Sequence, residues 1–219
     1  MRPAAVILDF DGVLVDSLAL HLAAWQAAVE TVFGVPLADQ ESLAGHATRT
    51  IAHILCRRHG APKQSKALIA AKELWITSRF DQLPLLTGSA DFIRSLAESG
   101  IPYAVASNST GGFVRGALAY HELQVPLVLT SSEVRRPKPA PNIFWQCANH
   151  LGISPKDRIN IVVYEDSLHG IKAAVHAGMT AVGVCSEQPA TKLLAAGAAA
   201  VCNDLGDALA QGWLNRRLI

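Results

Sequence analysis

The sequence predicts an α/β protein, with a parallel sheet covered by helices on both faces and an inserted all-helical unit. Three observations support this fold class. Short β-rich runs alternate with helical patterns from Pro84 onward, as in sheets built from βαβ units. A further β-rich run lies near the N-terminus, at residues 6–8. The chain between these regions is helical throughout and far longer than an ordinary crossover.

The N-terminal part begins with an apolar strand at residues 6–8 and continues into a helix. One face of this helix carries apolar residues at helical spacing: Leu18, Leu22, Trp25, Val29 and Val32. Glycine–proline breaks at 34–36 and 60–62 divide the remaining helical region. We therefore expect residues 17–83 to form a separate helical cap, and residues 1–16 and 84–219 to form the sheet domain.

The second part alternates helices and strands. Helices are expected near 89–99, 112–120, 141–151 and 168–177, and strands at 103–106, 127–129, 159–164, 180–184 and 199–202. Gly100, Gly152 and Gly178 follow three of the helical runs at the position where glycine commonly ends a helix.

Composition limits the class of protein. The chain has 219 residues, 50% of them hydrophobic, which is enough for one large domain or two unequal ones. The net charge of +1 argues against a non-specific nucleic-acid binder. The four cysteines are scattered and form no Cys-x-x-Cys pair, which indicates reduced packing residues rather than a disulfide framework or a zinc site.

The sequence predicts neither a signal peptide nor a membrane-spanning segment. Only a short apolar run follows Met1 and Arg2, so we expect no signal peptide. The longest apolar stretch, residues 193–202, is too short to span a bilayer. We expect a soluble cytoplasmic protein.

The segment Asp9-Phe10-Asp11-Gly12 is the first candidate for chemistry. Side chains two residues apart on a strand share a face, so Asp9 and Asp11 should point into one site. Gly12 allows the backbone to turn sharply away. Crowded carboxylates repel each other and favour a bound cation, although a bare Asp-x-Asp is more often an acidic turn.

Three further segments change this balance. They contain the pairs Ser107-Asn108 and Glu165-Asp166, and Lys138 within Arg-Pro-Lys-Pro-Ala-Pro. In a parallel α/β sheet the loops after the strands meet at one edge, where ligands bind. A carboxylate pair, a hydroxyl-amide turn, a lysine and an acidic pair should therefore converge.

With these four motifs in this order, residues 6–184 resemble the haloacid dehalogenase-like superfamily of phosphotransferases, which implies a Rossmann-like core and an inserted helical cap. The resemblance implies a Mg²⁺-dependent phosphoric monoester hydrolase. Asp9 would be the nucleophile and Asp11 the general acid and base. The metal would be bound by the Asp9 carboxylate, the Asp11 backbone carbonyl and the Asp166 carboxylate, with Glu165 either joining this shell or orienting it.

The same resemblance assigns the phosphoryl-binding groups. Ser107 and Asn108 would hold the transferring phosphoryl group through a hydroxyl and a backbone amide. Lys138 would neutralise phosphate charge and restrain Asp9. Pro137 and Pro139 flank this lysine and stiffen the backbone, which suits a group that needs a fixed position.

Substrate specificity should lie in the cap. His21 resembles a histidine that faces the active site in β-phosphoglucomutase-like members, with a core-lining residue as the alternative. Residues 45–49 resemble the cap loop that meets the distal end of the substrate, with Arg49 as its cation. We expect His21 and Arg49 to lie away from the phosphoryl centre. We expect Lys72 to lie on the outer face of its helix, with a position that reaches the site from the cap as the alternative.

The leading hypothesis is a phosphatase of a small phosphorylated metabolite, such as a sugar or polyol phosphate. The alternative is a β-phosphoglucomutase-like phosphotransferase, disfavoured because Ala44 stands where the mutases have a lysine. A dehalogenase does not need Asp11, a phosphonatase needs a cap lysine that the sequence does not identify, and a silent binding protein has no reason to keep all four motifs. We expect a small-molecule partner, no nucleic acid or membrane, and a monomer or weak homodimer.

Overall fold

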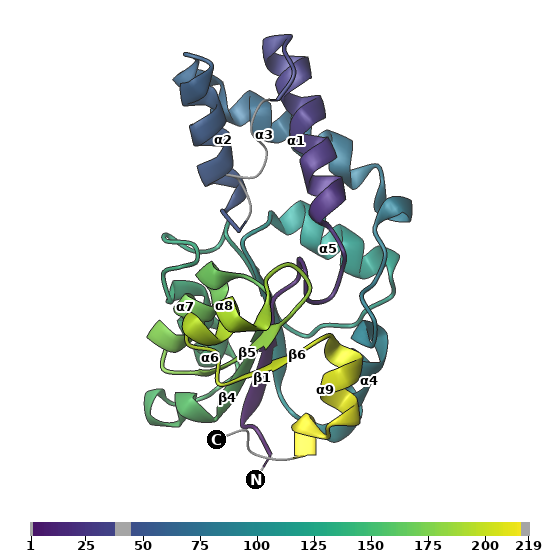
Figure 1. Cartoon of the computed structure of the whole chain (residues 1–219), viewed down its shortest axis with the longest axis vertical. Helices are drawn as coiled ribbons and strands as arrows, with labels where there is room; N and C mark the ends of the chain where they lie inside the picture. The colour runs from purple at the N-terminus through teal and green to yellow at the C-terminus, as the bar shows by residue number, and fades with distance from the viewer. Residues whose placement is uncertain (1, 38–44, 216–219) are drawn as a thin grey trace.

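A computed structural model describes residues 2–37 and 45–215. Its described strands form one parallel sheet in the order β3-β2-β1-β4-β5-β6 (Figure 1). The strands are β1 (Ala5–Leu8), β2 (Tyr103–Ser107), β3 (Val128–Thr130), β4 (Ile161–Glu165), β5 (Thr180–Val184) and β6 (Ala200–Cys202). The predicted α/β fold with a parallel sheet is confirmed.

Helices cover both faces of the sheet. One face packs against α4 (Ser89–Ser99), α5 (Gly111–Tyr120) and α9 (Leu205–Ala210), and the other against α6 (Asn142–His150), α7 (Leu168–His176) and α8 (Ala190–Ala195). The central strand β1 shows why: Val6 and Leu8 belong to the first hydrophobic cluster, Ala5 and Ile7 to the second.

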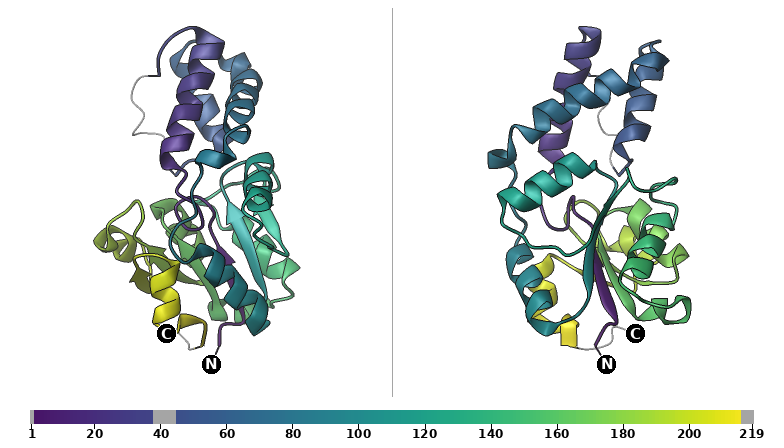
Figure 2. Two further views of the ribbon diagram at one scale, coloured as in Figure 1. Left: turned by 90° about the vertical axis from the view of Figure 1, so that its right-hand side faces the viewer. Right: turned by 180° about the vertical axis from the view of Figure 1, so that it is seen from behind.

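Three helices stand beyond the carboxyl edge of the sheet (Figure 2). They are α1 (Leu18–Phe33), α2 (Thr48–Arg58) and α3 (Ser65–Thr77). They pack around a small cluster of their own that includes Trp25, Leu55 and Leu68. We call these three helices the cap. The domain boundaries at residues 17 and 83 stay a prediction from the sequence.

The two connections of the cap lie side by side. The Asp16 amide donates to the Pro84 carbonyl at 3.0 Å, and Val15 forms an antiparallel bridge with Leu85. The chain therefore enters and leaves the cap through one paired segment, next to the end of β1.

Several element boundaries differ from the sequence expectation. The strand expected from Ile159 begins at Ile161, because residues Pro155–Asn160 form a 3₁₀ helix. The short helices α8 and α9 were not predicted, since six residues hold too few turns to show a helical period. None of the described helices is both long and apolar enough to cross a bilayer.

Candidate active site

The carboxyl edge of the sheet brings the four sequence motifs together. Asp9 and Asp11 follow β1, Ser107 ends β2, and Glu165 ends β4 next to Asp166. Lys138 reaches the same place from the loop between β3 and α6. Strands β1, β2 and β4 are direct neighbours in the sheet, which explains why segments so distant in sequence meet here.

Lys138 is the centre of a buried ion-pair network. Its Nζ donates to Asp9 Oδ1 at 2.6 Å, to Glu165 Oε1 at 2.5 Å and to the Ala106 carbonyl at 2.7 Å. Burial alone would lower the pKa of Lys138, but the charges of Asp9 and Glu165 outweigh it and raise that pKa. Lys138 therefore stays charged and fixes the Asp9 carboxylate.

The acidic groups exceed this single cation. Asp9, Glu165 and Asp166 are buried, and one oxygen of each lies within 4.8 Å of the others. Burial and the neighbouring carboxylates raise the pKa of both Asp9 and Asp166. Three carboxylates against one ammonium leave two negative charges unbalanced, so the donor set fits a hard divalent cation.

Asp166 is the least occupied member of this cluster. It is 3% exposed, and no hydrogen-bond donor reaches it within the described residues. Gly12 packs directly against it: a Cβ at Gly12 would lie 2.1 Å from Asp166 Oδ2, and the φ angle of Gly12 is +72°. The close approach and the left-handed backbone both require glycine here.

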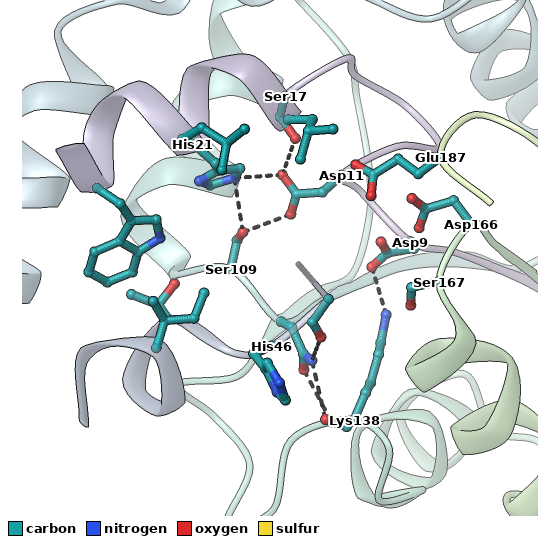
Figure 3. A pocket seen from close by; sticks show the side chains of 17 residues that line it. Asp9, Asp11, Ser17, His21, His46, Ser109, Lys138, Asp166, Ser167 and Glu187 are labelled. Atoms are coloured by element: carbon teal, nitrogen blue, oxygen red, sulfur yellow. Dashed lines mark hydrogen bonds and ion pairs between the residues drawn. The ribbon is translucent and has the colours of Figure 1, made fainter. Parts of the chain in front are cut away.

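Asp11 points toward the cap rather than toward Lys138 (Figure 3). Its Oδ1 contacts the Ser17 hydroxyl at 2.6 Å and His21 Nε2 at 2.9 Å. Its Oδ2 accepts from the hydroxyls of Ser109 at 2.7 Å and Ser107 at 3.1 Å. Burial would raise the pKa of Asp11, but His21 and these hydroxyls outweigh it and hold that pKa below its ordinary value.

This network corrects one expectation and adds two residues. His21 was expected away from the phosphoryl centre, yet it contacts Asp11 directly, because α1 starts right after the Asp11 loop. Ser17 and Ser109 were not singled out. Ser17 stands at the start of α1 without capping it, and its proximity to the acidic motif was the only signal.

Glu165 has both carboxylate oxygens occupied. Oε1 is bound to Lys138, and Oε2 accepts from the Ser167 hydroxyl at 3.0 Å. Ser167 also caps α7 by accepting from the Gly170 amide at 3.0 Å, and a Cβ at Gly170 would overlap the Glu165 carboxylate. These contacts anchor the Glu165 side chain between Lys138 and Ser167.

Asn108 ties the core to the cap. Its Nδ2 donates to the carbonyls of Lys138 and Gly45, each at 3.3 Å, and its Oδ1 accepts from the Lys138 amide at 3.1 Å. The Gly45 carbonyl also contacts His169 Nδ1 at 3.2 Å. The loop that carries Lys138 and the cap loop therefore share one amide side chain.

A pocket lies between this polar edge and the cap. Its core wall contains Asp9, Asp11, Asn108, Lys138 and Asp166, and its cap wall contains Leu18, His21, Leu22, Trp25, His46, Thr48 and Ile51. Glu187, from the loop after β5, also lines it; a single glutamate in a loop gave no sequence signal.

Two cap cations do not line the pocket. Arg49 is exposed and donates to the Ser131 carbonyl at 3.3 Å, while Ala44 lies outside the described residues. Lys72, expected on an outer face, is buried; that expectation was wrong. Its Nζ pairs with Glu73 at 2.9 Å and lies over the rings of Trp25 and Phe113, at 5.9 and 5.2 Å from their centroids, because α3 packs on α5.

Comparison with known proteins agrees with this geometry. The sequence-family model of the haloacid dehalogenase-like hydrolases matches residues 6–184 of this chain. Fructose-1-phosphate phosphatase YqaB of Escherichia coli K12 is 31% identical over 191 residues, covering 84% of this chain and 97% of that protein. β-Phosphoglucomutase of Bacillus subtilis 168 is 30% identical over 202 residues, covering 84% of each chain.

A solved structure shows the same fold. The crystal structure of a hydrolase from Pseudomonas syringae has a TM-score of 0.82 at 24% identity, covering 94% of this chain and 96% of that one. This chain belongs to the haloacid dehalogenase-like hydrolases. The resemblance and the enzyme class predicted from the sequence are thereby confirmed, with a phosphatase among the relatives.

Proposed function

We propose that this protein is a Mg²⁺-dependent phosphatase that hydrolyses a small phosphorylated sugar or polyol. One observation carries the proposal: the Asp9 carboxylate lines the pocket, is held by Lys138 at 2.6 Å and belongs to a buried acidic cluster. A carboxylate fixed in this way is suited to attack phosphorus once the negative charge around it is balanced. The sugar-phosphate phosphatase among the relatives supports the substrate class.

Asp9 is the proposed nucleophile. One of its oxygens attacks phosphorus, a new P–O bond forms, and the bond to the ester oxygen breaks, which leaves an aspartyl-phosphate and an alcohol. Water then attacks the same phosphorus, inorganic phosphate leaves, and the Asp9 carboxylate is restored. Lys138 keeps the attacking group oriented through both steps.

Asp11 is the proposed acid and base. It gives a proton to the departing ester oxygen and takes a proton from the attacking water. The hydrogen bonds from Ser17, His21 and Ser109 favour its carboxylate form, which suits the second step. For the first step Asp11 must carry a proton and turn it toward the ester oxygen, and the proton taken from water in the second step restores this form. His21, which contacts Asp11 Oδ1, is a positioning residue.

Mg²⁺ is the proposed cofactor. The carboxylates of Asp9 and Asp166 and the backbone carbonyl of Asp11 would hold it, with Glu165 supporting Lys138 beside them. When bound, the ion would neutralise the charge of the carboxylates and the phosphate, which otherwise repel each other.

Phosphate contacts come from the core, and substrate contacts from the cap. We assign the phosphoryl group to Ser107, the Asn108 backbone amide and Lys138. We keep Arg49 as a contact for the distal end of the substrate, although it must first leave the Ser131 carbonyl. The cap, residues 17–83, would then close the pocket over the sheet domain.

Chelation tests the cofactor and the mechanism together. Hydrolysis should stop after exhaustive treatment with EDTA and return when Mg²⁺ is added. A matched measurement of thermal unfolding, with and without Mg²⁺, should show a higher Tm with the ion, because ligands that bind only the folded state stabilise it. Full activity after chelation would contradict the proposal.

The mutase is the second candidate, supported by the relative from Bacillus subtilis. A mutase holds a bisphosphorylated intermediate and so needs cations in the cap. Among the described residues that line the pocket, no cap residue is a lysine or arginine, which favours hydrolysis.

A panel of phosphorylated metabolites decides between the two. Phosphate release from hexose, pentose and polyol phosphates with Mg²⁺ should exceed the conversion of β-glucose 1-phosphate to glucose 6-phosphate. Efficient isomerisation with only minor phosphate release would make the mutase correct. We further propose the cytoplasm as the compartment and a monomer or weak homodimer as the working state.

A further inference from the structure

Glu187 is a pocket residue for which the proposed chemistry has no use. It follows Ser186, whose hydroxyl donates to the Gly12 carbonyl at 2.5 Å. This bond fixes the loop after β5 against the turn that follows Asp11. Figure 3 shows the Glu187 carboxyl group on the side of Asp11 and Asp166. No hydrogen-bond donor reaches it within the described residues.

A second cavity adjoins the pocket at this glutamate. Leu18, Leu22 and Glu187 line both hollows. The second cavity also contains Asp16 and Asp204, with the amides Gln188 and Asn203, and no lysine, arginine or histidine among its described lining residues. Glu187 therefore stands in a shared wall between the phosphoryl centre and an acidic, amide-rich hollow.

The cations near the pocket are already engaged. Lys138 is bound by Asp9 and Glu165, and Arg49 by the Ser131 carbonyl. The sequence of residues 38–44 contains no lysine or arginine. A second phosphate on the substrate would thus approach the Glu187 carboxylate with no unengaged lysine or arginine among the described lining residues, whereas a hydroxyl or ammonium group would meet an acceptor.

We propose that Glu187 is a specificity-determining residue that selects monophosphates with a donor-rich distal end. Its carboxylate accepts hydrogen bonds from hydroxyl or ammonium groups of the substrate, whose distal end extends past Leu18 and Leu22 toward the second cavity. The same carboxylate repels a second phosphate. The inference deepens the proposed function and rests on it.

Steady-state kinetics of the full chain with Mg²⁺ test the selection. Three compounds are compared: a hexitol 6-phosphate, glucosamine 6-phosphate and fructose 1,6-bisphosphate. Glu187→Gln should raise kcat/KM for the bisphosphate about tenfold, equivalent to about 1.4 kcal/mol, mainly through KM. It should lower kcat/KM for the two monophosphates several-fold. Glu98→Gln, an exposed acid on α4, is the matched control and should change none of the three.

The two monophosphates separate the two kinds of donor. A larger loss for glucosamine 6-phosphate than for the hexitol phosphate identifies an ammonium partner, and equal losses identify hydroxyl groups. Glu187→Lys should favour the bisphosphate still more than Glu187→Gln, since it adds the missing cation.

An unchanged ratio of bisphosphate to monophosphate kcat/KM in both variants, with Tm unchanged, would overturn the inference and leave the phosphatase proposal standing. A wild-type protein that hydrolyses none of the three compounds would contradict the proposed function instead. In that case, calorimetry measures the binding of the same compounds to the wild type and to the Glu187 variants. An unchanged ratio of bisphosphate to monophosphate affinity would again overturn the inference.

Discussion

The two walls of the pocket are built on different principles. On the core wall, two charged groups are held by several partners: Lys138 has three acceptors within 2.7 Å, and Asp11 has four partners within 3.1 Å. On the cap wall, Leu18, Leu22, Trp25 and Ile51 offer mainly apolar surface. The core wall is suited to orient reacting atoms, and the cap wall to exclude water and sort substrates by shape. The comparison predicts that equal-sized changes have unequal consequences on the two walls.

The largest effect should come from Asp9→Asn. The change is nearly isosteric but removes the nucleophile, so phosphate release should fall to background. Because it also relieves the repulsion among three buried carboxylates, Tm should stay the same or rise. Substantial residual turnover in a phosphate-release assay would mean that another group attacks phosphorus.

Asp11→Asn should have the next largest effect. Loss of general acid–base help should slow hydrolysis roughly 10²–10⁴-fold, while Mg²⁺ affinity measured by calorimetry stays close to that of the wild type, since the proposed ligand is the backbone carbonyl. Ser17→Ala, which removes one donor to Asp11, is the matched control with a smaller effect. A double variant no slower than Asp11→Asn would show that both act through the same group.

A third comparison concerns the contact between the cap and α5, where Lys72 lies. Lys72→Met removes a buried ammonium that pairs with Glu73 and lies over Trp25 and Phe113. We expect a loss of about 1–3 kcal/mol in the free energy of unfolding, the usual scale for a buried charged group left without its partner. Lys66→Met, at an exposed position of the same helix, should leave denaturant unfolding unchanged. Equal free energies of unfolding for the two variants would show that the contacts of Lys72 do not stabilise the packing of the cap on α5.

The smallest effect should come from the cap wall. Ile51→Val takes one methylene from the pocket lining, so KM should change by no more than about tenfold, differently for hexose and pentose phosphates. The value of kcat should be nearly constant, because this apolar side chain offers no hydrogen bond or charge to the reacting groups. A large fall in kcat would mean that Ile51 helps to place the reacting phosphate.

The same contrast explains what could be predicted from the sequence. Parallel strands followed by polar turns place Asp9, Lys138 and Asp166 at one edge whatever the helices do, so these positions followed from the order of the motifs. The burial of Lys72 depends on how α3 packs against α5, and the contact of His21 with Asp11 depends on where α1 starts after the Asp11 loop. A helical period describes neither. Glu187 and Ser109 could be recognised as pocket residues only from the structure, which places both beside the carboxylates at the edge of the sheet.

The hydrophobic clusters also set how the molecule opens. The cluster around Trp25, Leu55 and Leu68 is separate from the two that hold the sheet, so cap amides can exchange with solvent while the sheet remains folded. In deuterium exchange, α2 should exchange faster than β1 and β4. Faster exchange in α2 would make local opening of the cap a property of the enzyme in its own right, because such opening would set how often the pocket is open to solvent between turnovers.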